Sequence, residues 1–321
     1  MNPGLHDVLQ AMGPQAGHWV DLWHIFLVLC TLVFGAVLAA MLLAVRRAPR
    51  VDVPVPPDLG TVNQPEPGPR RSVTAAIVAS VLGLLALLAA SVFTDRAMAR
   101  LSLADAVQIE VTGHQWWWTI KYLGDPDQTF ETANEIHVPV GRPVIVRLKS
   151  EDVIHSLWVP SLAGKKDLIP GRTAVMTFRA DQPGLYRGQC AEFCGLQHAF
   201  MAFNVHAEPP AQFEAWRQQQ LTAPPPPTDP QAVRGQAVFQ AASCAMCHSV
   251  AGTMAGARHA PDLSHVASRL TLAAGTLPNS PTNLSAWIAD PQKFKPGTNM
   301  PATPLSTEDL AALVAYLGTL K

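Results

Sequence analysis

Two short segments of the sequence concentrate side chains that can hold metals or haem. The first reads Gln189-Cys-Ala-Glu-Phe-Cys-Gly-Leu-Gln-His-Ala-Phe-Met201 and offers two thiols, an imidazole and a thioether on one loop. Soft sulfur and imidazole ligands select copper, zinc or iron–sulfur centres. A copper site needs a further imidazole, and His155, which follows Ser150-Glu-Asp-Val-Ile at the end of a predicted strand, is the leading candidate. The segment therefore predicts a metal centre.

Several kinds of site could use these residues. A structural zinc site of two Cys and two His leaves Met201 without a role. A mononuclear blue-copper site needs one cysteine and leaves Cys190 over. A disulfide between Cys190 and Cys194 is feasible in an oxidising compartment but does not explain the histidines. Two bridging thiolates suit two metal ions, so a binuclear copper centre for one-electron transfer is the interpretation that uses every ligand.

The second segment is Cys244-Ala-Met-Cys247-His248. C-x-x-C-H is an attachment sequence for c-type haem, in which two thioethers anchor the porphyrin and the histidine ligates iron. A thioredoxin-like redox pair would need a βαβ setting, which the surrounding sequence does not predict. The segment therefore predicts a covalently bound haem.

A low-spin haem that carries electrons needs a second axial ligand, typically methionine. Met246 lies inside the attachment motif, and Met254 is too near it to reach the other haem face. Met300 is distant enough to fold over that face. His259 or His265 is the alternative sixth ligand.

The elements around the first segment are short strands. β-Branched residues alternate or cluster at 107–111, 135–139, 144–148 and 173–178, with Pro, Gly and Asp between them. Several short strands without helical patterns predict a small all-β sandwich or barrel over residues 101–221. Residues 212–220 at its end are expected to form a polar helix.

The second segment lies in a different kind of domain. The proline-rich run 222–230 predicts a semi-rigid linker. After it, residues 232–241 and 307–320 have amphipathic helical patterns, the latter capped by Ser306 or Thr307. Residues 231–321 are therefore expected to form an all-α domain.

Residues 1–100 predict a membrane hairpin. The stretches 25–45 and 73–93 carry no charge, and each has the roughly 20 residues that cross a ~30 Å hydrocarbon core. We expect Cys30 to be a packed thiol inside the first span and no cleaved signal peptide, because no basic region precedes that span. The connecting loop 46–72 is basic, which places it in the cytoplasm and both termini outside. Its arginines are Arg46, Arg47, Arg50, Arg70 and Arg71.

The composition agrees with a membrane protein. Of the 321 residues 48% are hydrophobic and 15% charged, against roughly 25% charged in soluble proteins. With 23 basic and 24 acidic residues the net charge is −1, which gives no electrostatic case for a nucleic-acid partner.

The segment Cys190–Met201 resembles the CuA motif of cytochrome c oxidase subunit II. Gly113-His-Gln-Trp-Trp-Trp118, Ser150-Glu-Asp-Val-Ile-His155-Ser and residues 165–172 resemble other motifs of that family. The likeness runs from the first span to about Trp216 and implies a cupredoxin-like domain behind a transmembrane hairpin. The resemblance implies these CuA ligands: His155, Cys190, Cys194, His198, Met201 and the main-chain oxygen of Glu192.

The same resemblance implies further roles. The carboxylate of Glu192 would reach a magnesium ion shared with subunit I, and Trp116 would be the aromatic through which electrons enter. Asp152 matches an acidic residue near the donor or proton-exit surface. Where many relatives carry a glutamate at the start of the second span, this chain has Glu66-Pro-Gly-Pro-Arg-Arg71 and no acid inside the span, which argues against proton uptake through this subunit.

The C-terminal domain resembles class I cytochrome c. Met300 matches the axial methionine of that family. Pro261 matches the proline whose carbonyl orients the proximal histidine, although His259-Ala260 stand where glycine is common.

Together the two resemblances imply subunit II of a terminal, proton-translocating cytochrome c oxidase in a bacterial inner membrane, with periplasmic redox domains. Haem c would pass electrons through CuA to the oxygen-reducing haem a-type and CuB site of subunit I. Further expected partners are subunit III, the lipid bilayer, and a cytochrome c or quinol-oxidising complex as donor. The alternatives are a membrane-anchored electron-transfer relay outside any oxidase, or the CuA subunit of another copper reductase.

Overall fold

The computed structural model describes residues 4–48, 60 and 67–321, which form two compact units. One unit comprises residues 18–101. The other joins residues 4–17 to residues 102–321 and contains both clusters of candidate ligands. Arg50 and Glu66, used above in the predictions on loop charge and proton uptake, lie outside the described residues.

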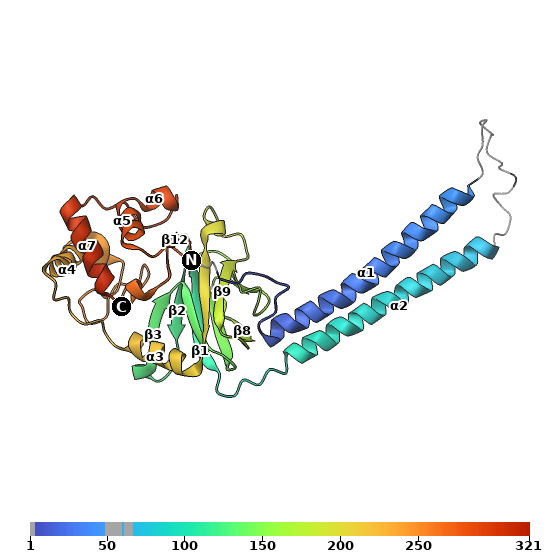
Figure 1. The fold of residues 1–321 in the computed structure, drawn as a ribbon, viewed down its shortest axis with the longest axis horizontal. Helices are drawn as coiled ribbons and strands as arrows, with labels where there is room; N and C mark the ends of the chain where they lie inside the picture. Colours follow the sequence, from blue (N-terminus) through green and yellow to red (C-terminus); the bar gives the residue numbers. More distant parts are fainter. Residues whose placement is uncertain (1–3, 49–59, 61–66) are drawn as a thin grey trace. The chain divides into compact units, whose positions relative to one another are not determined.

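The first unit is built from two long helices, α1 (Pro14–Arg47) and α2 (Pro67–Met98), drawn in blue and cyan in Figure 1. An 18-residue window of α1 has a mean hydropathy of 2.8, and one of α2 has a mean hydropathy of 2.5. No residue in either window is buried. Both helices extend beyond the predicted spans 25–45 and 73–93. By length and composition each can cross a membrane.

The β domain consists of two five-stranded sheets that pack face to face. The strand orders are β3-β2-β1-β5-β8 and β4-β10-β9-β6-β7, with parallel pairs β1/β5 and β4/β10. Strands are present in all four predicted segments. The strands are β1 (Val107–His114), β2 (Trp117–Tyr122), β3 (Phe130–Ala133), β4 (Glu135–Pro139), β5 (Pro143–Ser150), β6 (His155–Trp158), β7 (Lys166–Leu168), β8 (Ala174–Arg179), β9 (Gly184–Cys190) and β10 (Ala202–Glu208).

The core of this domain follows from the two-residue period of the strands. In β2 burial alternates strictly, so that Trp118, Ile120 and Tyr122 face inward. Trp118 is fully buried against the ring of Phe203 from the opposite sheet, at 5.5 Å between centroids. Helix α3 (Pro210–Leu221) closes one end and is the polar helix predicted at 212–220.

The segment before α1 packs on the β domain rather than forming a lead-in to the hairpin. Leu5 forms a parallel bridge with Tyr186 in β9, and the amide of Met12 donates to the Ser161 carbonyl at 2.8 Å. The sequence predicts these residues as part of the hairpin segment 1–100, because nothing local in them indicates a strand partner so far along the chain.

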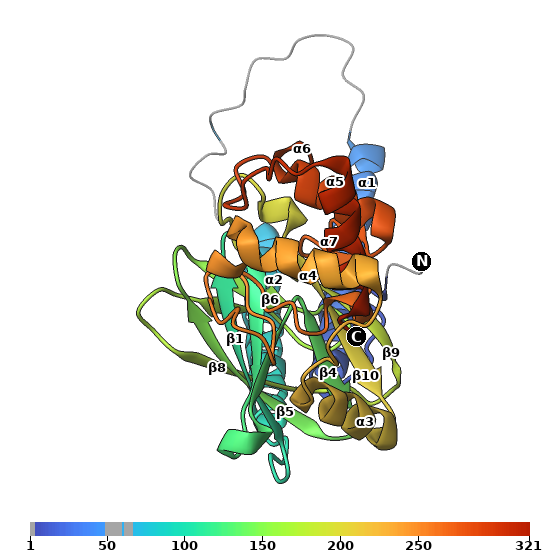
Figure 2. The same ribbon diagram turned by 90° about the vertical axis from the view of Figure 1, so that its left-hand side faces the viewer.

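The C-terminal domain is mainly helical. Its two principal helices cross closely, since a Cβ on Gly235 of α4 would lie 1.9 Å from the Ala312 carbonyl oxygen of α7 (Figure 2). Ser306 caps α7 by accepting from the Asp309 amide, which decides between the two predicted caps. The elements are α4 (Pro230–Ala241), α5 (Pro281–Ala289), α6 (Pro291–Phe294), α7 (Thr307–Thr319), β11 (Thr271–Leu272) and β12 (Leu277–Pro278). Among the described residues outside the hairpin, short 3-10 helices are η2 (Pro126–Gln128), η3 (His198–Phe200), η4 (Ser243–Met246) and η5 (Val266–Ser268).

The helical domain is hydrogen-bonded to the β domain. The Leu270 amide donates to the Glu135 carboxylate at 2.7 Å, and the Ala202 amide donates to the Ala274 carbonyl at 3.0 Å. These bonds join residues far apart in the chain, so the two folds form one compact unit.

Candidate copper and haem sites

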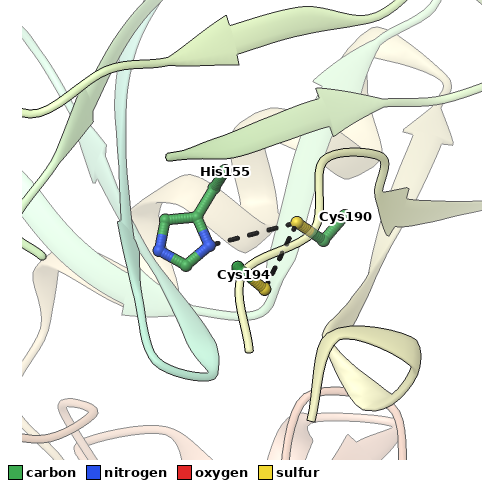
Figure 3. A group of neighbouring side chains, drawn as sticks. All are labelled: His155, Cys190 and Cys194. Atoms are coloured by element: carbon green, nitrogen blue, oxygen red, sulfur yellow. Dashed lines mark hydrogen bonds between the residues drawn. The ribbon is translucent and has the colours of Figure 1, made fainter. Parts of the chain in front are cut away.

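The two thiols of the first cluster lie side by side and buried. Cys190 ends β9, Cys194 follows in the next loop, and their sulfur atoms are 3.8 Å apart. A disulfide bond is about 2.05 Å long, so the two cysteines are not bridged. His155, the first residue of β6, directs its Nδ1 at the Cys190 sulfur from 3.9 Å, as Figure 3 shows.

The remaining predicted ligands surround the same pair of sulfurs. His198 Nδ1 lies 3.6 Å from the Cys194 sulfur, and the Met201 thioether lies 3.8 Å from it. The main-chain oxygen of Glu192 is 3.3 Å from the Cys190 sulfur. Each thiol therefore has one imidazole and one weaker donor beside it, which is the donor set that two soft metal ions bridged by thiolates require.

The loop geometry that brings these groups together is set by backbone hydrogen bonds. The Cys190 amide donates to the Met201 carbonyl at 2.9 Å, which closes the loop at its two ends. Gly195 turns the chain at φ +107, a conformation that side chains other than glycine rarely adopt. The His198 amide then donates to the Gly195 carbonyl at 3.1 Å and starts η3.

The thiols influence each other's protonation. Hydrogen bonding to Cys194, aided by His155, lowers the pKa of Cys190, and the same contact raises the pKa of Cys194. Two thiolates this close repel each other. A bound cation removes that repulsion and lets both ionise, so the electrostatics of the pair fit a metal.

Asp152 holds the imidazole of His155 from behind. Its Oδ1 lies 2.8 Å from His155 Nε2, and its carboxylate also accepts from the Gln115 and Val153 amides. Because a carboxylate accepts, Nε2 carries the proton and Nδ1 keeps its lone pair toward the sulfurs. Burial lowers the pKa of His155, but the hydrogen bonds to Asp152 and Cys190 outweigh it and raise that pKa. The sequence motif does not by itself indicate this contact, although Asp152 and His155 are only three residues apart.

The tryptophan motif donates two hydrogen bonds to the loop of predicted copper ligands, residues 190–201 (the copper loop). The indole N–H of Trp116 donates to the Cys194 carbonyl at 2.9 Å, and the side chain of Gln115 donates to the same oxygen at 2.8 Å. Trp118 is a core residue, and Trp117 stacks on His114 at 4.2 Å between centroids.

The carboxylate of Glu192 points away from the sulfurs. It accepts from Lys165 at 2.8 Å, and both side chains are almost half exposed. The Glu192 carboxylate therefore forms an exposed ion pair with Lys165 and is not part of the sulfur cluster.

Another group of possible ligands lies on β4 and β10. Nε2 of both His137 and His206 lies 3.9 Å from Glu135 Oε2. The two imidazoles, however, are stacked at 4.2 Å with their planes 2° apart. In-plane lone pairs of parallel rings cannot converge on one ion, so this arrangement does not suit a metal.

The C-x-x-C-H segment lines a cavity of about 570 Å³ in the helical domain, within the roughly 300–1,000 Å³ range of ligand and cofactor pockets. Cys244, Cys247, His248, Pro261 and Met300 all contribute to its walls. The predicted haem-binding residues are thus brought together around one space.

The orientation of His248 fits an iron ligand. Its Nδ1 lies 2.6 Å from the Pro261 carbonyl oxygen, and a carbonyl only accepts, so Nδ1 carries the proton and Nε2 offers a lone pair. Burial lowers the pKa of His248, which keeps the imidazole neutral. Of the alternative sixth ligands, His265 is bonded to the Lys321 carbonyl and is not among the lining residues, whereas His259 lines the cavity as Met300 does.

The cavity also reaches the tryptophan motif of the β domain. Trp116 lies in its wall and is only 8% exposed. One face of this indole therefore borders the haem cavity, while its N–H contacts the loop that carries both thiols.

Two family models match the chain in tandem. Residues 124–208 match the periplasmic domain of cytochrome c oxidase subunit II, and residues 232–321 match cytochrome c. Among curated proteins, cytochrome c oxidase subunit 2 of Alkalihalophilus pseudofirmus is 43% identical over 218 residues, which cover 68% of this chain and 62% of that protein. The subunit 2 of Bacillus sp. strain PS3 is 36% identical over 68% of this chain and 63% of its own length. The matches thus span somewhat less than two thirds of these relatives.

Among solved structures, the periplasmic domain of subunit II of the cytochrome oxidase of Bradyrhizobium japonicum is 31% identical. It covers 37% of this chain and 96% of that domain, with a TM-score of 0.35. The tandem match and the sequence identity to curated relatives agree with the motifs on both sides of the linker. The chain belongs to the cytochrome c oxidase subunit II family and carries a cytochrome c domain after its β domain.

Proposed function

We propose that this chain is the electron-accepting subunit of a membrane-bound terminal oxidase, with a haem c and a binuclear CuA centre. The observation that carries the proposal is the convergence of two thiols, two imidazoles and a thioether at 3.6–3.9 Å, next to a cavity lined by a C-x-x-C-H motif. When bound, the haem and the copper pair each exchange single electrons at nearly fixed geometry.

The copper pair would be held at the ends of β6 and β9. Cys190, Cys194, His155 and His198 would hold the two ions. Met201 and the main-chain oxygen of Glu192 would complete the set. Asp152 keeps the His155 ring oriented, which preserves the geometry that fast electron exchange needs.

The haem would occupy the cavity of the cytochrome domain. Cys244 and Cys247 would form the thioether links, and His248 would ligate iron through Nε2 while the Pro261 carbonyl fixes its ring. Met300 is the proposed sixth ligand, which favours a high potential.

Trp116 is the proposed connection between the two centres. Its indole borders the haem cavity and donates a hydrogen bond to the Cys194 carbonyl. It therefore offers a short route of bonded and contacting atoms from one site to the other.

The remaining parts of the proposal concern the membrane and the partners. Helices α1 and α2 would anchor the chain, with Arg46 and Arg47 ending α1 and Arg70 and Arg71 beginning α2 on the cytoplasmic side. Both redox domains then lie in the periplasm. Subunit I, with its haem a-type and CuB site, would reduce oxygen, subunit III is a further expected partner, and Glu192 would reach the magnesium ion shared with subunit I.

Two measurements on the purified full chain test the proposal. Metal and haem analysis should give about two copper atoms per haem, as a binuclear thiolate-bridged site and one C-x-x-C-H motif require. Copurification should recover a large polytopic haem-bearing partner. Uptake of zinc or of a single cupric ion would contradict the copper assignment, whereas absence of the partner would favour a free-standing relay.

A further inference from the structure

Lys295 of the cytochrome domain is buried where this domain meets the copper domain. It lies directly after α6, in the loop that leads to Met300, and is 2% exposed. Its ammonium donates to the Ala273 carbonyl of its own domain at 3.1 Å, and to the carbonyls of Trp116 at 2.7 Å and Phe200 at 2.9 Å in the copper domain. An ammonium has three N–H donors, so each has an acceptor.

The two acceptors in the copper domain adjoin the proposed electron route. The indole N–H of Trp116 donates a hydrogen bond to the Cys194 carbonyl. Phe200 directly precedes the predicted ligand Met201 in the chain. The ammonium therefore contacts the backbone of the copper-binding loop and of the proposed connecting aromatic at the same time.

The stability of the contact between the two domains does not by itself explain why a lysine occupies position 295. An ammonium is strongly hydrated, and among the described ion pairs none involves Lys295. Burial lowers the pKa of Lys295 to about 7, although the charge of Cys194 opposes this. An apolar side chain at this position would avoid the desolvation cost of burying an ammonium. Only a group with three N–H donors, however, can bond to the carbonyls of both domains at once and so favour the one domain arrangement that brings these carbonyls together.

The rest of the loop is fitted to the same surface. The side chain of Gln197 donates to the Pro296 carbonyl at 2.7 Å. Gly297 has φ +85, and a Cβ there would lie 3.3 Å from the Leu196 side chain and 3.6 Å from the Trp116 ring. The loop that begins at Lys295 and carries Met300 thus lies directly on the copper loop and the indole.

We propose that Lys295 is a positioning residue that fixes the cytochrome domain on the copper loop with the Trp116 indole between the two redox sites. This inference rests on the proposed function. Electron tunnelling falls exponentially with distance, so a fixed contact at this point sets the rate of transfer between the domains.

Hydrogen exchange on the full chain measures the contact without relying on oxidase activity. In Lys295→Met, three carbonyls lose their donor. The interface amides of Ala202 and Leu270 should then exchange about tenfold faster or more, the factor that corresponds to a loss of about 1.4 kcal/mol. The Leu123 and Ala267 amides, bonded within their own domains, should keep their rates. The matched control is Lys293→Met, an exposed lysine of α6.

A second measurement addresses electron transfer. After flash reduction of the haem in the loaded full chain, the rate of transfer to copper should fall by about tenfold or more in Lys295→Met, because small misplacements of reacting groups are costly. The haem spectrum and the copper resonance signal should be unchanged. The inference would be overturned if the hydrogen exchange of the interface amides and the rate of electron transfer were both unchanged. Loss of the haem or the copper signal would also overturn it, because Lys295 would then be needed for the stability of one site.

Failure of this inference and failure of the proposed function give different results. A wild-type chain without a binuclear copper signal would refute the proposed function, while the exchange comparison still reports on the contact. If Lys295→Met does not accumulate, Lys295→Gln, which keeps part of the donor capacity, faces the same two outcomes with smaller expected changes.

Discussion

The sulfur of Cys194 contacts three of the proposed copper ligands: Cys190, His198 and Met201. Replacing it with serine removes one bridging thiolate and leaves the other donors in place. We expect Cys194→Ser to abolish the mixed-valence copper signal in electron paramagnetic resonance while the haem spectrum persists. Cys30→Ser, which alters a thiol of α1, is the control, and a copper signal that survives Cys194→Ser would refute the ligand assignment.

Asp152 acts on the same centre without touching the sulfurs. Asp152→Asn keeps the shape of the side chain but weakens the hydrogen bond that fixes the His155 tautomer. Loss of such an outer contact typically costs ~10–100-fold in metal affinity, and we expect a copper affinity lower by that factor in a competitive titration. Asp127→Asn, in the exposed helix η2, should leave it unchanged. Equal affinities in both variants would show that Asp152 has no role in holding the imidazole.

At the scale of elements, the crossing of α4 and α7 depends on Gly235. Its Cβ would lie 1.9 Å from the Ala312 carbonyl oxygen, so Gly235→Ala must push the helices apart. Overpacking of this kind costs about 1–3 kcal/mol, and we expect a lower melting temperature of the cytochrome domain in thermal denaturation followed by circular dichroism.

Gly318 in α7 provides the control for this substitution. It has no heavy atom within 4 Å of the Cβ position, so Gly318→Ala should stabilise α7 by roughly 0.5–1 kcal/mol. Equal melting temperatures for the two variants would contradict the close crossing.

Strands β4 and β10 give the β domain a sensitivity to acid. Burial and the neighbouring His137 lower the pKa of His206 from 6.5 to about 4, although Glu135 and Glu208 oppose this. Between pH 6.5 and 4, His206 is therefore protonated in the unfolded chain but neutral in the folded chain. The free energy of unfolding decreases as the pH drops through that window. His137 contributes in the opposite direction, because Glu135 and Glu208 raise its pKa despite burial.

Substitution of His206 isolates its share of this effect. We expect the melting temperature of His206→Gln to fall less steeply than that of the wild-type chain between pH 6.5 and 4, the window set by the shifted group. An identical slope in both proteins would show that the imidazole does not titrate as described.

The sequence predicts the elements and ligands of this molecule better than the contacts between them. The C-x-x-C-H motif and the Cys190–Met201 segment each hold several candidate ligands within a few residues, so the sequence alone predicts that these side chains lie close together. The contacts of Lys295 with Trp116 and of Leu270 with Glu135 join residues more than 100 positions apart. No local pattern marks such pairs, because a buried lysine or glutamate looks in the sequence like a solvated one.

On the scale of the whole molecule, the surface of the cytochrome domain is close to neutral. Two of its six basic residues, Arg269 and Lys295, are buried, which leaves four exposed cations against four acids. The basic residues are Arg234, Arg258, Arg269, Lys293, Lys295 and Lys321, and the acidic residues are Asp262, Asp290, Glu308 and Asp309.

This balance predicts weak steering of a charged electron donor. We expect the rate at which a small soluble cytochrome c reduces the haem to change less than about threefold between ~10 mM and ~200 mM salt, whereas steered association falls steeply over that range. Stopped-flow reduction at several salt concentrations measures this. A steep decline would reveal a charged patch that the formal count does not capture.

Under the proposed function, the burial of Trp116 beneath the Gly297 loop limits where a carrier can deliver electrons. While the cytochrome domain is docked, no foreign carrier can touch that indole, and the outer face of the cytochrome domain becomes the sole entrance. Selectivity among carriers then resides in the domain that follows the proline-rich linker 222–230. Grafting a different C-terminal domain that keeps the loop from Lys295 to Met300 should therefore change which carrier reduces the chain, while the loop of predicted copper ligands keeps its contacts.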